Sequence, residues 1–101
     1  MKLIQLLTEL ISDELDDAKK YAELALQYKE QQPDIAKPFR ALSDEEMRHM
    51  ERLHAAAENA IAEYRRDKGE PPADMLAVYR YVHEQETKRA REIKILQAMY
   101  D

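Results

Sequence analysis

The chain is 101 residues long and carries 21 acidic and 16 basic side chains, so its formal net charge is −5. That length suits one domain with a single core, which we expect to span residues 1–101. The acidic balance, without a basic stripe, argues against a nucleic-acid partner. The absence of cysteine excludes disulfides, thiolate metal sites and iron–sulfur centres. One glycine, four prolines and many strong helix formers predict an all-α fold.

The apolar start of the chain, Met1–Ile11, has some features of a signal peptide. Glu9 and Asp13 interrupt it, however, and no small-residue cleavage site follows. No apolar run is long enough to span a membrane. We therefore expect a cytoplasmic protein with no membrane partner.

The first helix is predicted from about residue 2 to residue 30. Apolar and small side chains recur there at steps of three and four, which is the period of an amphipathic helix. Glu14 occupies one position of this apolar stripe. We expect Pro33 to end the helix and Asp34 to cap the next one.

The second helix is predicted from about residue 35 to residue 67, and its stripe contains Glu46 and His49 among apolar residues. Ser43-x-x-Glu46 can also be read as a capping box, which would restart the helix at Asp44 and make Glu46 a cap partner. The stripe continues upstream of this motif, which favours one uninterrupted helix.

The third helix is predicted from about residue 75 to residue 99. A loop over residues 68–74, with the only glycine and two prolines, precedes it. Short loops make sequential helices antiparallel neighbours, so we expect an antiparallel three-helix chain.

A carboxylate–histidine group is the main candidate for function. Glu46 and His49 are three residues apart, so they share one helix face. With the first turn centred near residue 32, a rise of about 1.5 Å per residue puts Glu14 level with His49 to within a couple of ångströms, and with Glu46 to within about one turn. All three side chains can therefore converge across one antiparallel helix pair.

Such a group is suited to a metal ion. Carboxylates bind hard divalent cations, and imidazole adds affinity for iron, manganese or zinc. Two-metal helical bundles use one Glu from each of two helices and a Glu-x-x-His from each of the other two. The alternative is that Glu14 reaches solvent or a basic partner such as Arg48 or Arg52, while Glu46 and His49 form a surface pair.

At this point the sequence resembles a known family. Glu14, with Tyr21 seven residues on, is similar to the first helix of rubrerythrin and ferritin-like proteins. The segment 42–49, followed by Leu53, resembles their second helix, and the two motifs are similarly separated. The likeness covers residues 1 to about 65.

The resemblance implies a site with two iron ions, or with manganese or zinc as alternatives. In it Glu14 would be a terminal ligand, Glu46 a bridging ligand and His49 a terminal imidazole ligand. We expect Tyr21 to hydrogen-bond a ligand carboxylate. The implied chemistry is oxidation of iron(II) by oxygen or peroxide, for iron handling or peroxide removal.

Two features of that family are missing from this chain. A full ferritin-like bundle has a fourth helix with a second Glu-x-x-His, and rubrerythrins proper carry a cysteine-ligated iron domain that feeds electrons to the site. Without that domain, whether the protein turns over as an enzyme stays open.

Two arrangements would supply the missing ligands. In the first, two chains each contribute Glu14, Glu46 and His49, as in the half-ferritins found as encapsulated ferritins; this predicts a homodimer or higher even oligomer, which could work inside a protein shell. In the second, Glu86 reaches the site within one chain. With the second turn centred near residue 70, Glu86 lies opposite about residue 54, roughly 7 Å from the level of His49. We therefore favour the dimer.

A second cluster follows from the same level-matching. Glu51-x-x-His54 repeats the spacing on another face of the second helix, and His54 and Glu58 should lie near His83 and Glu86. They could form a second metal site, or only a solvated face with helix salt bridges. The alternative for the whole chain is a non-enzymatic helical interaction or scaffold module without metal.

Overall fold

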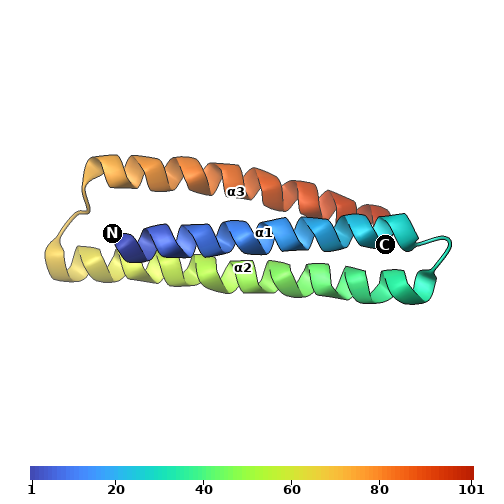
Figure 1. Ribbon diagram of the computed structural model, residues 1–101. Helices are drawn as coiled ribbons and strands as arrows, with labels where there is room; N and C mark the ends of the chain where they lie inside the picture. The colour runs from blue at the N-terminus through green and yellow to red at the C-terminus, as the bar shows by residue number, and fades with distance from the viewer.

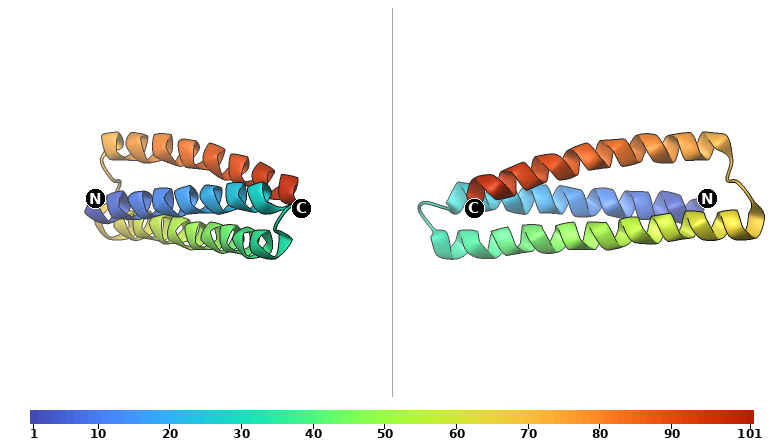
Figure 2. Two further views of the ribbon diagram at one scale, coloured as in Figure 1. Left: turned by 45° about the vertical axis from the view of Figure 1, so that its right-hand side comes forward. Right: turned by 180° about the vertical axis from the view of Figure 1, so that it is seen from behind.

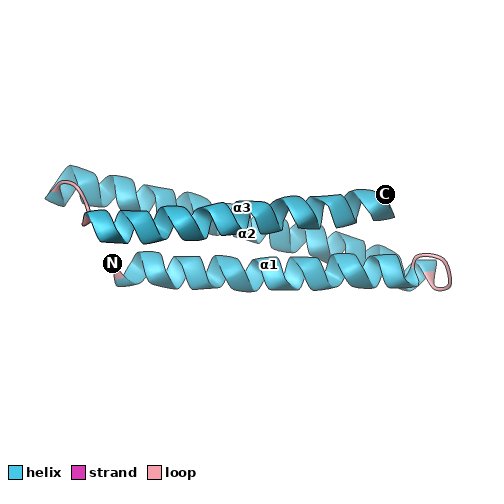
Figure 3. Ribbon diagram, turned by 90° about the horizontal axis from the view of Figure 1, so that it is seen from above, coloured by secondary structure: helices cyan, strands magenta, loops and turns pink.

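Three long helices make up almost the entire molecule. The computed structural model describes residues 1–101 and contains α1 (Lys2–Tyr28), α2 (Pro33–Lys68) and α3 (Ala73–Tyr100). They form a rod of 56 × 18 × 18 Å in which α1 and α3 run in the same direction and α2 runs against both (Figure 1). The structure has no strand, and loops occur only at the ends of the rod (Figure 3). The predicted all-α class is confirmed.

The helices begin and end close to the predicted residues, but the first turn is built differently. Pro33 does not end α1; it is the first residue of α2, where its missing amide proton costs nothing. Gln32 takes the N-cap position without a side-chain hydrogen bond, and Asp34 lies in the first turn, where a negative charge favours the helix dipole. The expectation that Asp34 is the cap was therefore wrong. None of the three helices is apolar enough over a sufficient length to cross a membrane.

The core lies mainly between α1 and α2. Leu15 and Ala18 of α1 pack with Met47 of α2 and Ile93 of α3 in one cluster of buried side chains. The small residues Ala18, Ala22 and Ala25 of α1 are fully buried, which lets α2 approach closely.

On α2 the buried stripe is rotated from the predicted one. Ser43 and Met47 are buried, whereas Glu46 of the predicted stripe is only half-buried. The cause is a polar contact that hydrophobic periodicity does not detect. The Ser43 hydroxyl donates to the Ala18 carbonyl oxygen at 2.7 Å and accepts from the Gln97 amide at 2.9 Å, so it joins all three helices. Ser43 lies inside α2, so the capping-box interpretation was wrong.

The third helix packs mainly on α1 rather than on α2, its neighbour in sequence. The Arg89 guanidinium donates to the Ser12 hydroxyl at 2.9 Å and forms an ion pair with Asp16. At the C-terminal end of α3, Arg40 of α2 holds Asp101 through two bonds of 2.9 and 3.0 Å. The N-terminal half of α3 stands away from α2, and the two helices approach each other toward the end at residue 100 (Figures 1 and 2). The expectation that α2 and α3 pack as close neighbours was therefore wrong for that half.

Candidate metal centre

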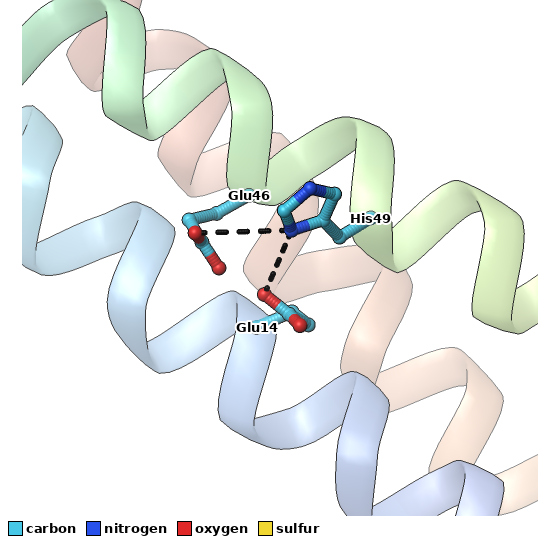
Figure 4. Close-up of side chains that lie close together, drawn as sticks. All are labelled: Glu14, Glu46 and His49. Carbon is cyan, nitrogen blue, oxygen red and sulfur yellow. Dashed lines mark ion pairs between the residues drawn. The ribbon is translucent and has the colours of Figure 1, made fainter.

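Glu14, Glu46 and His49 converge at the middle of the α1–α2 pair (Figure 4). Their ligand atoms all lie within 4.8 Å of one another, and no other group of acidic, histidine or cysteine side chains in the structure is gathered in this way. The Nδ1 atom of His49 is 3.6 Å from Oε2 of Glu14 and 3.8 Å from Oε1 of Glu46. The level-matching across the first turn thus places the three side chains together.

The group lies at the edge of the helix pair, not in its core. The side chains of Glu14 and Glu46 are 25% and 18% exposed, and that of His49 is 48% exposed. Figure 4 shows the three side chains in front of α1 and α2, with α3 behind these helices. Ser12 and Asp16, which flank Glu14 in sequence, contact α3 through Arg89. Glu14 therefore points to the face of the pair that α3 does not cover, which we call the open face.

The group is electrostatically suited to a cation. A hydrogen-bond interaction with Glu14 raises the pKa of the Glu46 carboxyl, burial and the Glu14 charge raise it further, and His49 partly opposes the shift. No arginine neutralises the pair, because Arg48 is bound to Asp44 at 2.5 Å and Arg52 forms no ion pair. The predicted alternative of a basic partner for Glu14 is therefore absent from the structure.

The donor set fits a transition-metal ion in chemistry and in spacing. Metal–nitrogen and metal–oxygen bonds are about 2.0–2.2 Å long, so two ligands of one ion lie at most about 4.4 Å apart. The two distances from His49 Nδ1 fall below that limit. Two carboxylates and one imidazole suit iron, manganese or zinc. One chain supplies only these three donors, which is half the ligand set of a two-metal bundle.

Tyr21 is placed differently from the prediction. Its ring stacks on that of Phe39 with centroids 6.2 Å apart, and no hydrogen bond joins its hydroxyl to Glu14 or Glu46. Tyr21 therefore packs the end of the α1–α2 pair near the first turn. Within one chain, its hydroxyl therefore holds neither candidate ligand carboxylate in place.

The residues predicted as a second cluster lie together on the other side of the molecule, between α2 and α3. The His54 and His83 rings stack with centroids 4.6 Å apart, and His54 Nε2 is 3.4 Å from Glu58 Oε1. The Tyr79 hydroxyl donates to the same Glu58 oxygen at 2.8 Å. Glu86 lines a pocket with both histidines and is not part of the group at Glu14. The single-chain arrangement, in which Glu86 completes the first site, is absent from the structure.

Comparison with known proteins agrees with this geometry. The rubrerythrin family model matches residues 5–101, which is almost the whole chain. The protein belongs to the rubrerythrin family. No curated protein and no solved structure matches the chain. The family assignment makes the helices a ferritin-like fold and implies iron binding, for which Glu14, Glu46 and His49 are the candidate group. It also extends the likeness seen over residues 1–65 to α3.

Proposed function

We propose that this protein is a ferritin-like, non-haem di-iron protein that oxidises iron(II) with oxygen or peroxide. In this proposal its metal pair is held between two copies of the chain. The observation that carries the proposal is the group of Glu14, Glu46 and His49, which is gathered to ligand distances but supplies only half a ligand set. Two copies would supply four carboxylates and two imidazoles.

The surface around the group supports a second copy as the missing partner. Leu3, Leu6 and Leu10 are 52%, 50% and 38% exposed, and steps of three and four residues continue their line to Glu14. An apolar stripe that leads directly to half a metal site is better explained by a partner than by solvent. A second chain would cover the stripe and complete the site together.

The position of the group along the rod supports two-fold symmetry. Glu14 lies within one residue of the midpoint of α1 (Lys2–Tyr28), and His49 is close to the midpoint of α2 (Pro33–Lys68). A two-fold axis perpendicular to the rod at this point would bring the metal-binding groups of the two chains together. The two chains would then lie side by side along their full length. It would also bring the Leu3 end of one chain against the opposite end of its partner, where Ile35 is 48% exposed.

The residues have distinct roles in this proposal. Glu46, the more buried carboxylate, would bridge the two ions, while Glu14 and His49 would each bind one ion. A bound pair of iron(II) ions supplies the two electrons that, with two protons, reduce one hydrogen peroxide to two waters. The half-exposed His49 leaves small oxidants a path to the site. Iron handling or peroxide removal would follow from this chemistry, and we propose the cytoplasm as its location.

Anaerobic iron(II) loading, read beside the native mass, tests the proposal. We expect an even oligomer that binds one iron per chain, and we expect Glu46→Ala to abolish this binding. Glu45→Ala is the matched control, because Glu45 is adjacent in sequence but exposed. A monomer without iron, or equal iron binding by Glu46→Ala and the parent, would instead favour a helical interaction module. To measure oxidation, the iron(II)-loaded protein is mixed with peroxide, and the absorbance of iron(III) is recorded.

A further inference from the structure

A pocket between α2 and α3 gathers metal-binding side chains that the proposed di-iron site does not use. It has a volume of about 200 Å³, and its wall includes His54 of α2 and both His83 and Glu86 of α3. The group of Glu14, Glu46 and His49 is not part of this wall, which α2 and α3 form together. Any ligand of this pocket is therefore distinct from the iron on the open face.

Glu86 is the first unexplained feature of this pocket. Only 8% of its surface is exposed, yet its carboxyl accepts no hydrogen bond and forms no ion pair. The two neighbouring donors are engaged elsewhere: Arg89 binds Ser12 and Asp16, and the Thr87 hydroxyl donates to the His83 carbonyl oxygen at 2.9 Å. Its oxygens keep contact with solvent at the pocket, so a cation could reach them, and it would neutralise a largely buried carboxylate.

His54 is the second unexplained feature. Its Nε2 atom is enclosed and makes no hydrogen bond, although Glu58 Oε1 lies 3.4 Å away. That Glu58 oxygen already accepts the Tyr79 hydroxyl. The His83 ring is stacked 4.6 Å from the His54 ring, so a second imidazole is within reach. Two residues of the same pocket wall thus lack a partner: His54 has a nitrogen without a hydrogen bond, and Glu86 has a carboxyl without an ion pair.

We propose that His54, His83 and Glu86 form a second site, which binds one divalent transition-metal ion and links α2 to α3. Two imidazoles and one carboxylate suit zinc or iron(II) and would leave coordination positions for water. The donor atoms are not all within 4.8 Å of one another, unlike those at Glu14, so binding requires a change of side-chain rotamer. The pocket, with its volume of about 200 Å³, provides space for that change.

Zinc binding tests the site. It is measured in a variant that lacks the candidate metal ligands on the open face. Glu46→Ala/His49→Ala lacks two of the three donors on the open face, and circular dichroism checks that it is folded. We expect it to bind one zinc per chain in equilibrium dialysis. On that background His83→Gln should weaken zinc binding by more than about 100-fold, and Glu86→Gln by at least about 10-fold. Glu92→Gln, exposed on the same helix, should bind zinc like the background.

The outcomes separate this site from the proposed function. Absence of zinc from the folded background variant, or equal affinity of Glu86→Gln and Glu92→Gln, would overturn the second site and leave the di-iron proposal untouched. If His83→Gln is misfolded, His54→Gln replaces it. Imidazole NMR signals of the parent give a check without any variant, since zinc should shift the signals of both His54 and His83. A shift confined to His49 would refute the site.

Discussion

Both faces of the α1–α2 pair carry candidate metal-binding side chains, but the two candidate sites are incomplete in different ways. On the open face, Glu14, Glu46 and His49 are already gathered, but one chain supplies only half a two-metal ligand set. On the covered face, His54 and His83 come from two helices of the same chain, but their donors are not gathered. By our proposals, the open face depends on a second chain, and the covered face on the position of α3.

The largest effect is expected from a substitution that disrupts the proposed dimer contact on the open face. Leu10→Glu places a charge on the exposed apolar stripe, next to the proposed two-fold axis. Because burying an unpaired charge costs several kcal/mol, the dimer dissociation constant should rise by more than about 100-fold. Iron binding should fall in parallel at low protein concentration.

Analytical ultracentrifugation over a range of concentrations measures this effect. Gln27→Glu is the matched control, because it adds the same charge to an exposed position elsewhere on α1. If Leu10→Glu and Gln27→Glu associate equally well, the stripe is not the dimer interface.

A smaller effect is expected where α3 is fixed to the other helices. Ser43→Ala removes the hydroxyl that the Gln97 amide donates to, and it leaves this buried amide without its acceptor. The free energy of unfolding should fall by about 1–3 kcal/mol. Urea unfolding measures it, with Asn59→Ala at an exposed position of α2 expected to stay within about 0.5 kcal/mol of the parent. A loss for Ser43→Ala as small as that control's would show that α3 does not depend on this contact.

The smallest effect concerns pH and the covered face. Burial raises the pKa of Glu86 to about 7, while the nearby Arg89 charge opposes the shift. A carboxyl whose pKa is raised on folding contributes fully to the free energy of unfolding when the pH is below its pKa in the unfolded chain, 4.5. This contribution is lost as the pH rises toward the folded-state pKa of about 7. Glu86→Gln stays uncharged, so its stability relative to the parent should increase by roughly 1–2 kcal/mol between pH 5 and pH 8.

Urea unfolding of chelator-treated protein at the two pH values measures this difference. His54, His83 and Glu51 line the same pocket and are present in both proteins, so only the change between variant and parent is compared. Glu92→Gln should show no such change. A constant difference between Glu86→Gln and the parent at both pH values would mean that Glu86 is not desolvated in solution.

Much of the fold could be predicted from the sequence because local signals determine it. Helical periodicity and two proline-containing breaks located three helices to within two residues at each end. The rise per residue was enough to bring Glu14 level with His49, because two helices joined by a short turn must run side by side. The same calculation placed Glu86 beside His54 instead of at the first group.

The remaining features depend on contacts that periodicity cannot detect. Ser43 looked like a helix cap, yet its hydroxyl joins three helices, because it lies where α1, α2 and α3 meet. The position of α3 on α1 follows from Arg89 and its contacts with Ser12 and Asp16, a polar interaction between residues far apart in sequence. Tyr21 stacks on Phe39 because both rings lie near the first turn.

The uneven attachment of α3 has a consequence for how the molecule opens. Its C-terminal half is held by Ile93 in the core, by Gln97 and by Asp101. Its N-terminal half follows the Gly69 turn, and its backbone stands off α2, which it contacts through the Tyr79 hydroxyl and the His83 ring. The free energy of local opening should therefore rise along α3 from Ala73 toward Tyr100. Fraying of the first turns would admit an ion to His54 and His83 while the α1–α2 pair stays folded, and a bound ion would in turn hold that end closed.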